Sequence, residues 1–253
     1  MAADVALALD PVREEAELRS YLGDDFRLDR LQHYQDHLDA EFADIGHEDT
    51  FYLTSKAYLY NLTAFAMTGT KLPYLRELTA QVPPGARLLD YGCGIGSDGL
   101  LLLEAGYRVE FADFDNPSTA YLRWRLRERG LEAPVHDLDG DVPGGFDAAY
   151  AFDVIEHVGD PFAFLGEMER RADLVAVNLL EPGPAEREPA SHRELPIAAI
   201  RSRAVDRGLR SYRIHHGRSH LVAYEPGGEP AAALARLRGR AAILVAEARR
   251  RLG

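Results

Sequence analysis

The chain has 253 residues, of which 46% are hydrophobic, so it can form one ample domain or one domain with an added cap. Its formal net charge is −12 at pH 7, which argues against a general nucleic-acid-binding protein because such proteins need a cationic surface. Cys93 is the only cysteine, which excludes an internal disulfide and favours a reducing, cytoplasmic compartment. We expect neither a signal peptide nor a membrane span, since the sequence shows no apolar run of about 18 residues.

Residues 11–80 are predicted to be helical. Pro11, followed by two glutamates, opens one helix, and a second carries an apolar stripe at helical spacing, formed by Leu28, Leu31, Tyr34 and Leu38. The aromatic-rich stretch 51–65 predicts one long helix or two short ones, and a further helix over 72–81 stops at the breaker Pro83-Pro84-Gly85. We therefore expect an N-terminal helical cap over residues 1–84.

The most informative stretch begins at Arg87, where two leucines lead to Asp90 and then to glycine at positions 92, 94 and 96. An apolar run from Leu100 follows, so the pattern predicts a buried strand, a tight glycine turn and the start of a helix. Glycine permits unusual backbone angles and leaves room for a ligand, and the N–H groups of a helix start favour an anionic or electron-rich group. The same glycines also fit the fingerprint of dinucleotide binding, so the turn alone does not select the ligand.

From Arg87 onward, strands alternate with helices. Such alternation predicts a parallel sheet with right-handed crossovers, and the last two strands, split by a short turn, predict an antiparallel hairpin. The predicted strands are 87–91, 108–114, 133–137, 146–152, 174–180, 211–215 and 220–224, and the predicted helices are 97–105, 117–129, 160–172 and 195–207. We expect a core over residues 85–228 and a C-terminal helix over 229–253, which either packs on the core or contacts a second copy in a homodimer.

Two stretches carry a resemblance to a known family. Asp90 and the glycines at 92, 94 and 96 form the string apolar-apolar-Asp-x-Gly-x-Gly-x-Gly, which resembles motif I of class I S-adenosylmethionine (SAM)-dependent methyltransferases. The stretch from Asp153 to Pro161, D-x-x-E-H-x-x-D-P, resembles the segment after strand four in small-molecule methyltransferases, including the O-methyltransferases of ubiquinone biosynthesis. The resemblance covers about residues 85–225. It implies an α/β, Rossmann-like, seven-stranded, mostly parallel sheet with a C-terminal antiparallel hairpin, and SAM as cofactor.

The acid at the end of the second predicted strand is the main candidate for binding a ribose. Asp113 follows the glycines by about 20 residues and can bind both ribose hydroxyls, although NAD enzymes use the same device and Asp115 lies close by. By resemblance, Asp137 meets the adenine amino group, Leu138 flanks the ring, and Phe152 and Asp153 lie beside the sulfonium. The predicted cofactor-binding residues are Asp90, Gly92, Gly94, Gly96, Asp113, Phe114, Asp137, Leu138, Phe152 and Asp153.

The implied reaction is an in-line transfer of a methyl group to an oxygen or nitrogen atom of a small-molecule acceptor. Histidine is the natural base for such a step, because its pKa lies near neutrality. His157 and His192 are the candidates, although His157 can equally cap a helix or pack under the cofactor. Tyr58 and Tyr60 are predicted to line the acceptor pocket, with packing between helices as the alternative.

Three alternatives stay open. Resemblance to small-RNA 2′-O-methyltransferases and to some quinone O-methyltransferases implies that Glu156, His157, His192 and Asp153 could together hold a divalent ion. The chain lacks the further histidine cluster of the small-RNA family, and we predict no metal. An NAD-dependent oxidoreductase would share the glycine turn and Asp113 but leaves the Asp153–His157 stretch unexplained. A non-catalytic SAM-binding protein would bind the cofactor without turnover. No nucleic-acid or membrane partner is expected.

Overall fold

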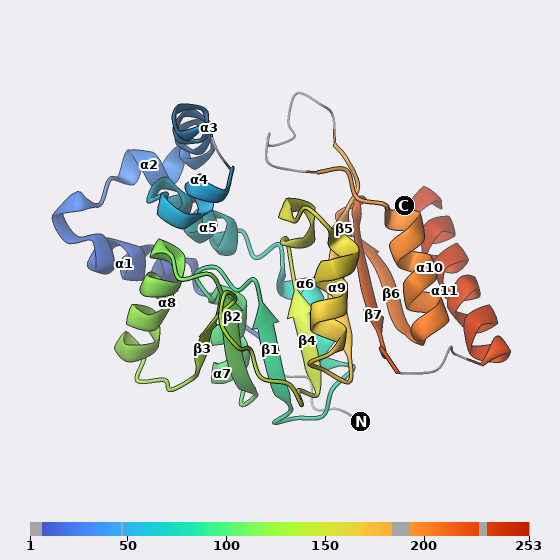
Figure 1. Ribbon diagram of the computed structural model, residues 1–253. Coiled ribbons are helices and arrows are strands. Elements are labelled where there is room, and N and C mark those ends of the chain that lie inside the picture. Colours follow the sequence, from blue (N-terminus) through green and yellow to red (C-terminus); the bar gives the residue numbers. More distant parts are fainter. Residues whose placement is uncertain (1–6, 47, 184–192, 228–231, 253) are drawn as a thin grey trace. The chain divides into compact units, whose positions relative to one another are not determined.

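The computed structural model describes residues 7–46, 48–183, 193–227 and 232–252 (Figure 1). Its seven-stranded sheet has the order β3-β2-β1-β4-β5-β7-β6. The pairs β1–β4, β2–β3 and β4–β5 are parallel, whereas β7 runs antiparallel to both β5 and β6. The strands are β1 Arg87–Tyr91, β2 Arg108–Asp113, β3 Val135–Asp137, β4 Ala148–Ala151, β5 Val175–Leu180, β6 Leu209–His215 and β7 Ser219–Tyr224. The predicted mostly parallel sheet with a terminal antiparallel hairpin is therefore confirmed.

Backbone contacts divide the chain into two compact units, which are described separately. We call the first the hairpin unit; it contains Arg76–Tyr91 and Pro143–Gly253 together with the first two residues. We call the second the loop unit; it contains Ala3–Leu75 and Gly92–Val142. The division into cap, core and tail expected from the sequence stays a prediction.

The hairpin unit is built on strands that are buried on both faces. All residues of β4 and nearly all of β5 are buried, as their continuous apolar sequences require in the middle of a sheet. Helix α9 (Pro161–Glu169) packs on β4 and β5, and α10 (Ile197–Arg207) packs on β6 and β7. Helix α11 (Ala233–Leu252) packs along β6 beside α10, as Figure 1 shows in orange and red. Gly239 permits this approach, because a Cβ there would lie 3.3 Å from Val205.

The outer side of α11 exposes apolar side chains. Leu234, Leu237 and Leu244 are among the most exposed large hydrophobic residues of the described chain. The contact of this helix with a second copy of the chain stays a prediction. Among the described residues, no helix combines the length and apolar character needed to cross a membrane.

Helices of the loop unit enclose a mixed apolar and aromatic core. Leu18, Leu59 and Tyr121 are almost completely buried there, together with Ile95 from the segment that follows β1. Asp10 caps the first helix by accepting from two backbone N–H groups, with Pro11 at its first position. The helices of this unit are α1 Pro11–Leu22, η1 Gly23–Asp25, α2 Leu28–Gln32, α3 Tyr34–Ile45, α4 Glu48–Thr54, α5 Ala57–Met67, α7 Ser97–Glu104 and α8 Pro117–Glu128, and α6 Leu72–Thr79 continues into the hairpin unit.

One helical prediction is wrong, and another had left open two alternatives between which the structure decides. The stripe from Leu28 to Leu38 does not form one helix, because the backbone leaves the helical region at His33 (φ −116°, ψ 38°) and so separates α2 from α3. Leu31 is buried, but Leu28 is 43% exposed. The aromatic stretch forms two helices rather than one. The break falls at Ser55, whose hydroxyl accepts a hydrogen bond from the Tyr58 N–H (3.0 Å).

Candidate functional site

The glycine segment after β1 is a tight loop in left-handed conformations. Gly92, Gly94 and Gly96 have φ values of +79°, +53° and +70°, which side-chain-bearing residues rarely adopt. The packing also requires them, because a Cβ on Gly94 would lie 3.1 Å from Leu62 and one on Gly96 would overlap Leu122. The predicted strand, turn and helix are confirmed. The glycines serve the packing of the loop as well as any ligand.

Asp113 lies at the end of β2 and binds this loop directly. Its Oδ2 accepts the Gly94 N–H (2.7 Å), and its Oδ1 accepts the Phe114 N–H (2.8 Å). Burial raises the pKa of the Asp113 carboxyl, and the two backbone hydrogen bonds oppose that rise. Each oxygen of an ionised carboxylate can accept a further hydrogen bond, so the group has the capacity for two hydroxyl donors.

The ends of β2 and β3 bring four predicted residues together. Asp113 pairs in register with Asp137, and the Leu138 N–H donates to the Asp113 carbonyl (3.1 Å). Asp137 Oδ1 accepts the Asp139 N–H (3.1 Å). Phe114 is 42% exposed, so its ring can stack on a planar ligand. This edge therefore presents acceptors for hydroxyl and amino groups beside apolar side chains.

The remaining predicted cofactor residues belong to the hairpin unit. Asp90, only 4% exposed, lies near the end of β1 and pairs in register with Tyr150 of β4. Phe152 is buried, with its ring centroid 5.2 Å from that of Tyr150. Asp153 follows with a φ of +57°, one of two described non-glycine residues with a positive value. A strained backbone that the surroundings hold in place is frequent at functional sites.

Asn178 of β5 holds Asp153 in this conformation. Its Oδ1 accepts the Asp153 N–H (2.7 Å), and its Nδ2 donates to Asp153 Oδ1 (2.6 Å) and to Ser219 Oγ (3.2 Å). Asn178 is completely buried. Asn178 was not predicted as a site residue, although a lone amide within the apolar run Val-Ala-Val-Asn-Leu-Leu indicated a buried polar role.

The segment after Asp153 forms a short 3₁₀ turn, η2 (Ile155–His157), with His157 half-buried at its end. Glu156 is 2% exposed, and its carbonyl accepts the Arg193 N–H (2.8 Å). Asp160 caps α9 by accepting from two backbone N–H groups, and Pro161 occupies the first turn. Helix capping thus accounts for the last two residues of the D-x-x-E-H-x-x-D-P stretch. The base role of His157 stays a prediction, and His192 lies outside the described residues.

The two predicted acceptor-pocket tyrosines lie on α5 in the loop unit. Tyr60 is 3% exposed, its ring centroid lies 5.9 Å from that of Phe26, and its hydroxyl accepts the Arg27 N–H (2.9 Å). Tyr58 is less buried and contacts the Phe51 ring edge-on at 5.8 Å. Tyr60 therefore packs between helices, and Tyr58 has more surface to offer a ligand. Both acceptor roles stay predictions.

Within the described ranges, no group of three or more His, Cys, Asp or Glu side chains has the arrangement of a metal site. The histidines of the hairpin are explained by packing. His220 is completely buried, its Nε2 lies 2.8 Å from Glu181 Oε1, and its Nδ1 contacts the Tyr212 hydroxyl. Burial lowers the pKa of His220 although Glu181 opposes the shift.

The sheet order, the glycine loop after β1 and the acid at the end of β2 together define the fold of class I SAM-dependent methyltransferases. Comparison with known proteins agrees. A family model described as "Methyltransferase domain" matches residues 67–182. The magnesium protoporphyrin IX methyltransferase from Synechocystis PCC 6803, solved with bound SAH, superposes with a TM-score of 0.54 at 16% identity, covering 83% of this chain and 98% of that one. That likeness shows a shared fold.

Curated relatives share closer sequence similarity. The "Ubiquinone biosynthesis O-methyltransferase" of Xanthomonas campestris pv. campestris (strain B100) is 32% identical over 123 residues, which are 47% of this chain and 47% of that protein. The protein of the same name from Bordetella pertussis (strain Tohama I) is 32% identical over 101 residues, 38% of this chain and 42% of that protein. The chain thus spans less than half the length of these relatives. The match to the methyltransferase-domain model, residues 67–182, covers less than half of the chain, and the likeness to the solved structure shows the fold.

Proposed function

We propose that this protein transfers a methyl group from SAM to an oxygen or nitrogen atom of a small organic molecule. The observation that carries the proposal is the half-buried Asp113 carboxylate, which is bonded to the Gly94 N–H and able to accept two more hydrogen bonds. A ribose offers two adjacent hydroxyl donors, which suit that capacity. The names of the similar proteins, ubiquinone biosynthesis O-methyltransferases, support oxygen as the acceptor atom.

The remaining parts of the cofactor would find complementary groups in the loop unit. Asp137 and Leu138, at the end of β3, suit an adenine amino group and ring, and Phe114 presents an exposed ring beside Asp113. The left-handed loop at Gly92–Gly96 ends at the first turn of α7, where backbone N–H groups favour a carboxylate. The roles of Asp90, Phe152 and Asp153 in cofactor binding stay predictions from the sequence.

SAM, when bound, supplies a methyl carbon that is already activated by its sulfonium. The protein must therefore orient the acceptor, exclude water and take a proton where the acceptor carries one. Orientation alone can lower a barrier by about 7–11 kcal/mol, and a positioned base adds about 10²–10⁴-fold. His157 is the first candidate for the base, since it follows the strained Asp153 by one short turn. His192 is the second.

Two measurements test the proposal. Isothermal titration of the full chain with SAM, with its demethylated product S-adenosylhomocysteine (SAH) and with NAD should show binding of the first two. Release of SAH in the presence of a library of phenols, quinols and amines should then identify an acceptor. Binding of NAD in place of SAH would favour an oxidoreductase, and SAH binding without turnover on any acceptor would favour a non-catalytic SAM-binding protein.

A further inference from the structure

One buried arginine connects the glycine loop to the N-terminal helix. Arg125 of α8 is completely buried, and its Nη1 donates to two groups of the loop, the Ile95 carbonyl (2.9 Å) and the Ser97 hydroxyl (2.8 Å). Ile95 and Ser97 flank Gly96. A single guanidinium thus holds the loop on both sides of its last left-handed residue.

The other nitrogens of this guanidinium bind two carboxylates of α1. Arg125 Nε donates to Glu17 Oε2 (2.8 Å), and its Nη2 pairs with Glu14 Oε1. The Ser97 hydroxyl in turn donates to Glu14 Oε2 (2.8 Å). Arg129 completes the cluster with bonds from its Nε and Nη2 to Glu17 (2.7 and 2.8 Å). Glu14 and Glu17 are only 3% and 7% exposed, so these contacts lie away from solvent.

A cluster of buried charges stabilises the contact between two helices less than apolar side chains of similar volume can. Burying charges costs several kcal/mol per ion, and apolar residues of similar volume often stabilise a fold as well or better. Apolar residues cannot, however, bind a carbonyl and a hydroxyl of a loop at fixed positions. The buried ions are therefore explained better by what they hold, the segment Ile95–Ser97, than by the stability that they add.

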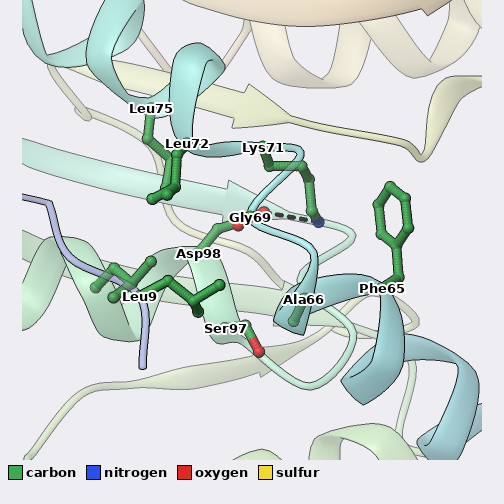
Figure 2. A pocket seen from close by; sticks show the side chains of 10 residues that line it. Leu9, Phe65, Ala66, Gly69, Lys71, Leu72, Leu75, Ser97 and Asp98 are labelled. Atoms are coloured by element: carbon green, nitrogen blue, oxygen red, sulfur yellow. Dashed lines mark ion pairs between the residues drawn. The ribbon is translucent and has the colours of Figure 1, made fainter. Parts of the chain in front are cut away.

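The loop needs such support from outside. Three glycines in five residues give it high backbone freedom in the unbound state, and that freedom is lost when a ligand binds a fixed conformation. A second ion pair supports the segment that directly follows the loop. Lys71 pairs with Asp98, in the first turn of α7 (2.7 Å), and Figure 2 shows its ammonium beside that carboxylate in a pocket that Ser97 also lines.

We propose that Arg125 and Ser97 are positioning residues, which, with Glu14 and Glu17, hold the glycine loop in its cofactor-binding conformation. Docking of α1 and binding of the adenosyl ligand are then coupled, so each strengthens the other by the same factor. The proposal rests on the proposed function, because it requires the loop to bind SAM. It assigns α1, which lies outside the matched methyltransferase domain, to cofactor binding.

The variant Ser97→Ala tests this most gently, since it removes one hydroxyl and leaves all four charges in place. Ser118→Ala is the matched control, because Ser118 is also a buried serine (2% exposed, against 7% for Ser97) and lies on α8, the helix that carries Arg125. Titration with SAH should show affinity about fivefold weaker for Ser97→Ala and unchanged for Ser118→Ala. Thermal unfolding of both variants separates this effect from a loss of stability. Equal SAH affinities in the two variants would overturn the proposal.

Hydrogen exchange measures the reciprocal effect. With SAH, amide exchange in α1 should slow more than exchange in α11 of the hairpin unit, and Ser97→Ala should reduce that difference. If the wild-type protein binds no SAH, the proposed function fails. If it binds SAH but α1 is protected no more than α11, only the positioning proposal fails.

Discussion

Two carboxylates of the loop unit, Asp113 and Glu17, have pKa values that are shifted in opposite directions. Burial raises the pKa of Asp113, where backbone N–H groups of Gly94 and Phe114 provide the opposing hydrogen bonds. Burial also acts to raise the pKa of Glu17, but hydrogen bonds and charges of Arg129 and Arg125 reverse the shift and lower it. The nature of the donor decides the outcome, since a guanidinium compensates a buried negative charge better than an amide does.

This difference separates a binding group from a supporting one. Glu17 receives hydrogen bonds from three guanidinium groups, those of Arg13, Arg125 and Arg129, so both of its oxygens are used within the fold. Asp113 receives one backbone hydrogen bond on each oxygen, so it is oriented and retains capacity for a ligand. An acid that is held by backbone amides at a strand end is therefore the stronger indication of a site.

The largest effect is expected when the binding carboxylate loses its charge. Asp113→Asn should weaken SAH binding by at least about 100-fold, because two charge-assisted hydrogen bonds contribute about 1.5–3 kcal/mol each. Asp115→Asn is the control, since the Asp115 side chain is 70% exposed and pairs with Arg123. Titration calorimetry measures both affinities. Equal affinities would show that Asp113 is only a structural acid.

Removal of the supporting carboxylate should act mainly on stability. Glu17→Ala leaves two buried guanidinium groups without one of their partners and should lower the free energy of unfolding by about 3–5 kcal/mol. Urea titration at pH 7 measures this loss. Glu15→Ala, on the same helix but paired only with Arg19 near the surface, should change stability by less than about 1 kcal/mol. Similar losses in the two variants would contradict the assigned roles.

Acid should weaken the contributions of both carboxylates, but over different pH ranges. The lowered pKa of Glu17 means that its stabilising contribution is complete above its ordinary value of 4.5 and is lost as the pH falls below it. The raised pKa of Asp113 means that SAH binding should weaken as the pH falls through a value above the ordinary 3.8. Below that pKa the affinity should drop up to tenfold per pH unit, and Asp113→Asn should show no such dependence. An affinity that stays constant down to pH 4 would contradict the raised pKa.

The smallest effects are expected at the two tyrosines of α5. Tyr58→Ala should reduce the use of the acceptor while SAH binding stays within about threefold, because Tyr58 has surface to offer a small organic ligand. Tyr60→Phe is the comparison, since it removes the hydroxyl bound by the Arg27 N–H and keeps the buried ring. Steady-state kinetics with an identified acceptor measures both. Equal losses of acceptor use and SAH affinity in Tyr58→Ala would argue against a pocket role.

The sequence predicted the sheet and the glycine loop because these depend on local patterns. Apolar runs of strand length, glycines at alternate positions and Asp113 after a strand each carry their signal within a few residues. The break at His33 was missed, since apolar spacing alone gives no sign of a single residue that leaves the helical region.

The buried ion cluster could not be predicted. Glu14 and Arg125 are separated by 111 positions in the chain, and charges on a predicted helix are ordinarily assigned to its solvent-exposed side. Asn178 lies on β5 and Asp153 follows β4, so only the pairing of these strands brings the two side chains within hydrogen-bond distance. Long-range polar partners are set by tertiary packing, which spacing in the sequence does not record.

The most direct test of the central claim is a structure of the protein crystallised with SAH. We predict that the ribose hydroxyls lie within hydrogen-bond distance of the Asp113 carboxylate and that the ligand contacts the loop at Gly92–Gly96. A ribose bound elsewhere, or SAH density absent from this loop at saturating ligand, would contradict the claim that Asp113 and the glycine loop bind the cofactor.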